Sequence, residues 1–176
     1  MEFDSLRLFL SEENIKRHVD HVNTVRLKYS ILEKSEPSIV GKSMYEISKM
    51  NISSDIKCEA INLLRYIRSH RVYFESFCEK SGKSDALIKS YASKESFLYS
   101  LYELARKETS GFLYVYKDRH GKVFASVDSN DSGAFIKRQP ILAIDLFEHS
   151  YFCDYYFNKE RYLRSALSHL NISKLG

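Results

Sequence analysis

Apolar residues recur at helical spacing near the start of the chain. From Ser11 onward they fall three or four positions apart, which places them on one face of a helix. These residues are Ile15, Val19, Val22, Val25 and Tyr29. Ser11 is a suitable N-cap, and Glu12 and Glu13 lie where negative charge favours the helix dipole. The pattern therefore predicts a long first helix that begins after Ser11.

A second helical region follows a break in this pattern. Pro37 and Gly41 interrupt the apolar period, which resumes over residues 55–78. The apolar residues of this region include Ile61, Leu64, Ile67, Val72 and Phe74. Two helices separated by such a break predict a helical hairpin in the first half of the chain.

The pattern of the second half changes from helix to strand. Helical spacing runs from Leu87 to Leu104. Residues 111–128 then form two β-rich runs around a polar, glycine-containing turn, which is typical of an antiparallel hairpin. Residues 139–147 predict a third strand. The sequence therefore predicts a small sheet after the helices.

The order of these elements predicts an α+β fold. Residues 148–170 return to a helical pattern, so the strands have helices on both sides in the sequence. We expect an N-terminal helical hairpin domain over residues 1–80. We also expect a C-terminal α/β domain over residues 81–176, in which helices flank a three-stranded antiparallel sheet.

Composition and charge narrow the class of protein. Of the 176 residues, 44% are hydrophobic, and no run approaches the roughly 20 apolar residues that span a bilayer. Residues 1–14 carry acids where a secretory or mitochondrial leader would be basic, so a cytoplasmic protein is expected. Lys and Arg outnumber Asp and Glu by 27 to 23 without a basic run. Nucleic acid and membrane are therefore not expected as partners, although this balance would help to attract a small anion.

The cysteines give no sign of a metal or redox motif. Cys58, Cys78 and Cys153 lie far apart, and no two of them form a CxxC pair. We expect reduced and mostly buried thiols.

Asp145 and His149 are the first candidates for chemistry. They lie four residues apart where a predicted strand gives way to a helix, so one turn of backbone can bring both side chains to one point. His18 and His70 lie on or beside the apolar faces of the two long predicted helices. Three imidazoles and a carboxylate would suit manganese or iron with an open coordination position. Each residue alone is more often an ordinary core or helix-end residue, and the pattern does not show that the four converge.

Short motifs around these residues resemble those of the iron/manganese superoxide dismutase family. Residues 145–151, DLFEHSY, are similar to the family signature D-x-W-E-H-x-Y, with Phe147 in place of tryptophan. Three further segments resemble family motifs, namely ENIKRH (13–18), SHRVYF (69–74) and TSGF (109–112). The resemblance covers nearly the whole chain and has the same order of a helical hairpin and an α/β lobe.

The resemblance implies a ligand set, a reaction and an oligomer. One manganese or iron ion would be bound by His18, His70, Asp145 and His149. The reaction would be the disproportionation of superoxide to dioxygen and hydrogen peroxide. The resemblance also implies a homodimer in which Glu148 bonds to the partner's His149. Phe152 would lie at this interface, where the family has tyrosine.

Several positions near the implied site depart from the family pattern. The family tyrosine eight residues after the first ligand is Arg26, and a histidine four residues after that ligand is Val22. The family also places a side-chain amide against the metal-bound solvent. Asn130 occupies the position of this glutamine in manganese-type members, and Tyr66 occupies its position in iron-type members.

Asn130, Arg26 and Tyr66 are therefore the candidate catalytic positions. Manganese is favoured over iron because Asn130 resembles the amide of the manganese-type loop. Arg26 could attract superoxide, obstruct its approach or extend into solvent, and the sequence leaves all three open.

Alternative functions stay open at this point. A working superoxide dismutase is favoured by retention of all four ligands. A structural or interaction protein that kept the fold while its catalysis weakened or was lost is favoured by the changes near the site and by the absence of tryptophan. No positive signal supports a third reading, a different metalloenzyme. His21, His169 and Cys153 are interpreted as lying outside the site.

Overall fold

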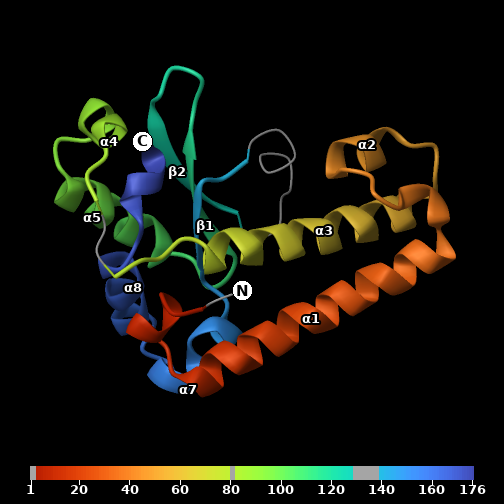
Figure 1. Ribbon diagram of the computed structural model, residues 1–176, viewed down its shortest axis with the longest axis horizontal. Helices are drawn as coiled ribbons and strands as arrows, with labels where there is room; N and C mark the ends of the chain where they lie inside the picture. Colours follow the sequence, from red (N-terminus) through yellow and green to blue (C-terminus); the bar gives the residue numbers. More distant parts are fainter. Residues whose placement is uncertain (1–2, 80–81, 129–138) are drawn as a thin grey trace.

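The N-terminal part of the molecule is built around two long antiparallel helices (Figure 1). The computed structural model describes residues 3–79, 82–128 and 139–176. Helices α1 (Glu12–Ser35) and α3 (Ser54–Phe74) pack along each other. The predicted α+β fold that begins with a helical hairpin is confirmed.

Short elements and side-chain caps frame the two long helices. The 3-10 turn η1 (Leu6–Leu8) precedes α1, while η2 (Pro37–Ile39) and α2 (Met44–Lys49) join α1 to α3 at the end far from the sheet (Figure 1). As predicted, Ser11 caps α1, because its Oγ accepts a hydrogen bond from the N–H of Asn14 at 3.2 Å.

Helix α2 was not predicted from the sequence. Its start has a capping box, in which Ser43 Oγ accepts the N–H of Glu46 at 3.2 Å and Glu46 Oε2 accepts the N–H of Ser43 at 2.8 Å. The S-x-x-E spacing of these residues was the signal that could have predicted this helix.

Helix α3 ends at Phe74, four residues before the predicted end at Cys78. The following residues pair with the C-terminal segment instead. The N–H of Cys78 donates to the carbonyl of His169 at 3.0 Å, and Ser76 accepts at its carbonyl the N–H of Asn171 at 2.8 Å. The backbone groups that would continue the helix are therefore used in tertiary contacts.

The sheet has three antiparallel strands in the order β2-β1-β3. They are β1 (Phe112–Lys117), β2 (Val123–Asp128) and β3 (Leu142–Asp145). Tyr114 in the central strand lies opposite Ser126 on one side and Ala143 on the other. Helix α3 packs against β3, and α5 (Lys94–Ala105) packs against β1 and β2. The predicted sheet flanked by helices is confirmed.

The helical pattern of residues 87–104 corresponds to two helices, α4 (Asp85–Ser90) and α5. Ser93 starts the second helix, because its Oγ accepts the N–H of Ser96 at 3.0 Å. A serine hydroxyl that caps a helix competes with continuation of the preceding helix, and this explains the break.

The predicted helix over residues 148–170 is also broken. It divides into η3 (Glu148–Ser150), α7 (Phe152–Tyr155) and α8 (Lys159–Ser168), and the short turn η4 (Ile172–Leu175) follows. Tyr156 interrupts the helix with a φ of 50°, in the left-handed region. Asn158 then caps α8 by accepting the N–H of Arg161 at 3.0 Å. Apolar periodicity alone did not reveal either feature.

The structure also bears on the predictions for membrane spans, cysteine burial and the domain boundary. None of the described helices is long and apolar enough to cross a membrane. The cysteines are free, but the prediction that they are mostly buried was wrong, since Cys58 and Cys153 are exposed and Cys78 is half-buried. The two exposed cysteines lie on α3 and α7 (Phe152–Tyr155), at helix positions that face solvent. The domain boundary near residue 80 stays a prediction, because residues 80–81 lie outside the described part of the chain.

Ser76 connects the end of α3 to the edge strand β3. Its buried Oγ accepts the N–H of Ala143 at 2.8 Å and donates to the carbonyl of Val72 at 2.6 Å. Ser76→Ala should lower the free energy of unfolding by about 1–3 kcal/mol, because it leaves the buried N–H without an acceptor. Urea unfolding measures this difference. Ser168→Ala, which removes an exposed local hydrogen bond, is the control, and equal losses in both variants would contradict the role of Ser76.

Candidate metal centre

Four side chains from distant parts of the chain meet at one point. His18 comes from α1, His70 from α3, Asp145 from the end of β3, and His149 from η3. The Nε2 atom of each histidine lies 3.2 Å from Asp145 Oδ2. One donor atom of each residue lies within 4.8 Å of the others. The structure thus brings together all four residues that the resemblance implied as ligands.

The packing of the elements explains this convergence. The rings of His18 and His70 meet edge to face across α1 and α3, with centroids 5.0 Å apart. Strand β3 packs against α3 and ends at Asp145, whose Oδ1 accepts the N–H of Phe147 at 2.9 Å. This turn leads directly into η3 and returns His149 to the same carboxylate.

The centre is closed on one side and open on the other. The side chains of His18, His70 and Asp145 have no exposed surface, whereas the side chain of His149 is 26% exposed. His21 beside it is also exposed. A small molecule can therefore approach the donors from the side of His149 and His21.

Burial and charge set the protonation of the donors. Burial opposes ionisation of Asp145, but the charge of His149 and the close approach of the other imidazoles outweigh it and hold the pKa of the carboxyl well below its usual range. Burial lowers the pKa of His18 from 6.5 to about 4, against the opposing effect of Asp145. At neutral pH Asp145 is an anion and His18 a neutral base. These are the forms that metal ions bind.

Hydrogen bonding fixes the tautomer of His70. Its Nδ1 lies 2.8 Å from the carbonyl of Tyr66, and because a carbonyl only accepts, Nδ1 carries the proton and donates it. In the neutral ring, Nε2 then has a lone pair that faces the Asp145 carboxylate. Two electron-rich atoms face each other in this arrangement, which a cation between them would stabilise.

Two of the four donor atoms also lack a hydrogen-bond partner. Among the described residues, the buried atoms without a hydrogen-bond partner include Nδ1 and Nε2 of His18 and Oδ2 of Asp145. Nearly all buried polar atoms in folded proteins have a partner. One metal ion would satisfy both His18 Nε2 and Asp145 Oδ2, so the residues fit a nitrogen-rich site for manganese or iron.

Aromatic rings enclose the imidazoles. Phe74 and Tyr73 contact the ring of His18, Phe112 contacts that of His70, and Phe147 contacts that of His149. Phe147 replaces the tryptophan of the family signature at this place. Such a surrounding lowers the local dielectric constant and strengthens the interaction between donors and a cation.

A buried tyrosine, Tyr162, bonds the backbone of the strand that carries Asp145. Tyr162 on α8 donates its hydroxyl proton to the backbone carbonyl of Asp145 at 2.8 Å, and its oxygen lies 3.4 Å from that of Tyr73. Helix α8 therefore helps to fix the backbone of the carboxylate ligand.

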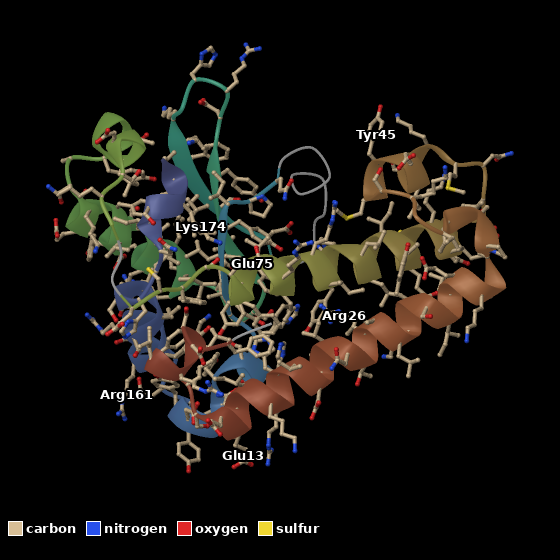
Figure 2. The ribbon with its side chains drawn as sticks, in the orientation of Figure 1. Glu13, Arg26, Tyr45, Glu75, Arg161 and Lys174 are labelled. Atoms are coloured by element: carbon tan, nitrogen blue, oxygen red, sulfur yellow. The ribbon has the colours of Figure 1, made fainter. Side chains whose placement is uncertain are left out.

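Of the other candidate residues from the sequence that the structure describes, only Tyr66 is found at the metal centre. Tyr66 lies at the centre, with its hydroxyl oxygen 3.4 Å from His149 Nε2. Arg26 is exposed partway along α1 (Figure 2), and its guanidinium donates to Asn23 Oδ1 at 3.4 Å. Asn130 lies outside the described residues. Glu148 and Phe152 are exposed, and their place in a dimer interface stays a prediction.

His21 was wrongly interpreted as lying outside the site. Its Nε2 lies 2.7 Å from the hydroxyl oxygen of Tyr66, and its ring centroid lies 4.5 Å from that of His149. Burial, and then the charges of His149 and His70, lower the pKa of His21. The missed signal was its spacing of three residues from His18, which places both on neighbouring positions of one helix face.

Comparison with known proteins agrees with this geometry. The family described as iron/manganese superoxide dismutases, C-terminal domain, matches residues 79–175, more than half of the chain. The iron superoxide dismutase of Salmonella typhimurium is 26% identical over 170 residues, which cover 91% of this chain and 84% of that protein.

Two relatives named for manganese match a shorter part. Manganese superoxide dismutase 1 of Halobacterium salinarum is 30% identical over 94 residues, which cover 49% of this chain and 46% of that protein. Manganese superoxide dismutase 2 of the same organism is 35% identical over 80 residues, which cover 44% of this chain and 40% of that protein. The aligned part thus spans less than half of each Halobacterium protein, and the relatives carry the names of both metals.

Proposed function

Since the chain belongs to the iron/manganese superoxide dismutase family, we propose that it is itself a superoxide dismutase. Two superoxide ions and two protons would give one dioxygen and one hydrogen peroxide. The observation that carries the proposal is the convergence of three histidine Nε2 atoms on Asp145 Oδ2 at 3.2 Å, where two of these buried donor atoms, His18 Nε2 and Asp145 Oδ2, have no hydrogen-bond partner.

One manganese or iron ion bound by His18, His70, Asp145 and His149 would supply the redox couple that oxidises one superoxide and reduces the next. Manganese is favoured by the position of Asn130 in the sequence. The Asp145 carboxylate offsets part of the charge of the cation. The neutral imidazoles leave a positive balance at the centre, and this balance favours binding of a small anion.

The surrounding residues restrict and guide the approach of the substrate. Phe74 and Phe112 pack against the buried imidazoles and exclude water from that side. Superoxide would enter past the exposed edge of His149. The hydroxyl of Tyr66 and the imidazole of His21 are exchangeable proton carriers at this entrance, where peroxide formation consumes protons.

We also propose a homodimer. Glu148 and Phe152 lie on the exposed surface next to His149 in sequence, and the rings of Tyr156 and Phe157 contact that of Phe152. Phe152, Tyr156 and Phe157 are 40%, 67% and 83% exposed, so these neighbouring apolar side chains form an exposed group. Contact with a second copy of the chain would bury them.

Elemental analysis of the purified protein, together with a superoxide-consumption assay on the same sample, tests the function. We expect near-stoichiometric manganese or iron and measurable activity. His70→Ala should lower the activity about 100-fold or more, because it removes a buried donor. His120→Ala, in the exposed turn between β1 and β2, is the matched control and should behave as the wild type.

The opposite result would favour a structural or interaction role for the protein. A folded wild-type protein with no metal and no activity, even after reconstitution with both ions, would indicate a structural or interaction protein that kept the fold without catalysis.

A further inference from the structure

Two polar side chains lie on the open side of the metal centre, where the substrate would enter. The hydroxyl oxygen of Tyr66, on α3, lies 2.7 Å from Nε2 of His21, on α1. The same oxygen lies 3.4 Å from Nε2 of the proposed ligand His149. The Tyr66 hydroxyl is thus held between a metal ligand and an exposed imidazole.

The firm hydrogen bond of Tyr66 is the one with His21. At 2.7 Å it has normal length, whereas 3.4 Å to His149 is long and His149 Nε2 already faces Asp145 Oδ2 at 3.2 Å. A phenol hydroxyl has one donor and two acceptor positions. The contact with His21 uses one of them, so the hydroxyl keeps the capacity to bond a molecule at the centre.

Other rings around the imidazoles offer no comparable group. Phe74, Phe112 and Phe147 present only carbon atoms. Tyr73 contacts the ring of His18, but its hydroxyl lies against that of Tyr162. Among the described aromatic residues around the imidazoles, Tyr66 is thus the one whose hydroxyl lies next to the metal donors.

We infer that the Tyr66 hydroxyl, oriented by His21, hydrogen-bonds the solvent molecule or small anion that occupies the open position of the metal. This inference rests on the proposed function. Tyr66 would be a catalytic residue because it touches the substrate. His21 would be a positioning residue because it acts through Tyr66. Arg26, exposed and bonded to Asn23, takes no part in this contact.

Azide binding to the iron(III)-loaded protein tests the inference without relying on turnover. Azide is a small anion whose coordination is followed by visible absorption. Tyr66→Phe should weaken azide binding about tenfold, since a hydrogen bond to a charged group is lost. Iron content should stay that of the wild type, because Tyr66 is not among the four proposed ligands.

Variants of His21 test the positioning role. His21→Leu should weaken azide binding in the same direction, and His21→Gln, which can still bond the Tyr66 hydroxyl, should restore most of the affinity. The double variant Tyr66→Phe/His21→Leu should be no weaker than Tyr66→Phe alone, as expected for two residues that act through one contact. Two controls should leave the affinity unchanged. They are Tyr45→Phe on α2, at the end of the helical hairpin away from the sheet (Figure 2), and His120→Gln in the turn between β1 and β2.

The outcomes separate this inference from the proposed function. Equal azide affinity of the iron-loaded wild type and the iron-loaded Tyr66→Phe variant would overturn the inference and leave the proposed function intact. A strong visible band of the azide-free wild type that Tyr66→Phe abolishes would show that Tyr66 coordinates iron itself, which also overturns it. A wild-type protein that takes up neither iron nor manganese would remove both proposals.

Discussion

Replacing Asp145 with asparagine is expected to give a folded protein that no longer binds a metal ion. Asp145 Oδ1 accepts the N–H of Phe147 at 2.9 Å, and the new side-chain oxygen can keep this bond. The new NH₂ group takes the place of Oδ2, 3.2 Å from three imidazole nitrogens, where it can donate to a lone pair. The variant keeps its shape but loses the anionic ligand.

The expected effect on function is large, and the effect on folding is small. Metal content of Asp145→Asn should fall below about a tenth of the wild-type value, and superoxide consumption should fall about 100-fold or more. The unfolding free energy of the metal-free variant should lie within about 1 kcal/mol of the metal-free wild type. Elemental analysis, a superoxide assay and urea unfolding measure these quantities.

Glu103→Gln provides the control, because it also removes one carboxylate charge but at a half-buried residue of α5, outside the centre, that pairs with Arg106. It should keep wild-type metal content. If Asp145→Asn also kept its metal, the ion would be bound at another place in the protein, and the four-residue centre would be wrong.

Removal of the metal ion should lower the melting temperature by about 10 °C. A ligand present at a thousand times its dissociation constant stabilises the folded state by about 4 kcal/mol, and each kcal/mol moves the melting temperature by about 2–4 °C in a chain of this size. The metal-free state also leaves the lone pair of His70 against the carboxylate of Asp145 and leaves His18 Nε2 without a partner.

Calorimetry of chelator-treated and reconstituted samples measures this shift. The melting temperature should rise with metal concentration, and Asp145→Asn should show no such rise. Equal melting temperatures with and without a bound ion would contradict the prediction, because an ion that binds only the folded state must stabilise it.

The sequence predicted the order of the elements well, and their ends less well. Runs of β-favouring residues around a glycine-containing turn located the sheet, whose strands β1 and β3 are almost entirely buried. Helical periodicity located both long helices, because each presents an apolar face to the core. The breaks at Ser93 and Tyr156 come from a hydroxyl cap and a left-handed backbone conformation. Apolar spacing contains no information on either. The end of α3 depends on pairing of Ser76 with Asn171, distant in the sequence, and no local pattern could reveal it.

The candidate site could likewise be predicted only in part from local sequence spacing. Spacing suggested that Asp145 and His149 could share a point, but their meeting with His18 and His70 depends on the packing of α1 and α3 against β3. The family resemblance supplied that step. It pointed to Tyr66, together with Arg26 and Asn130, as a group beside the metal, but it did not predict the contact of Tyr66 with His21.

The origin of the donors in two parts of the chain bears on the order of folding. His18 and His70 belong to the helical hairpin, whereas Asp145 ends β3 and His149 follows it. Tyr162 of α8 holds the backbone carbonyl of Asp145. Contacts between such distant segments form late, because closing the intervening chain costs entropy that local helix formation does not. A partly folded chain in which only the hairpin has formed would have two of the four metal donors, His18 and His70, and would lack the Asp145 carboxylate. Tight capture of an ion would thus mark the end of folding and hold the two parts together.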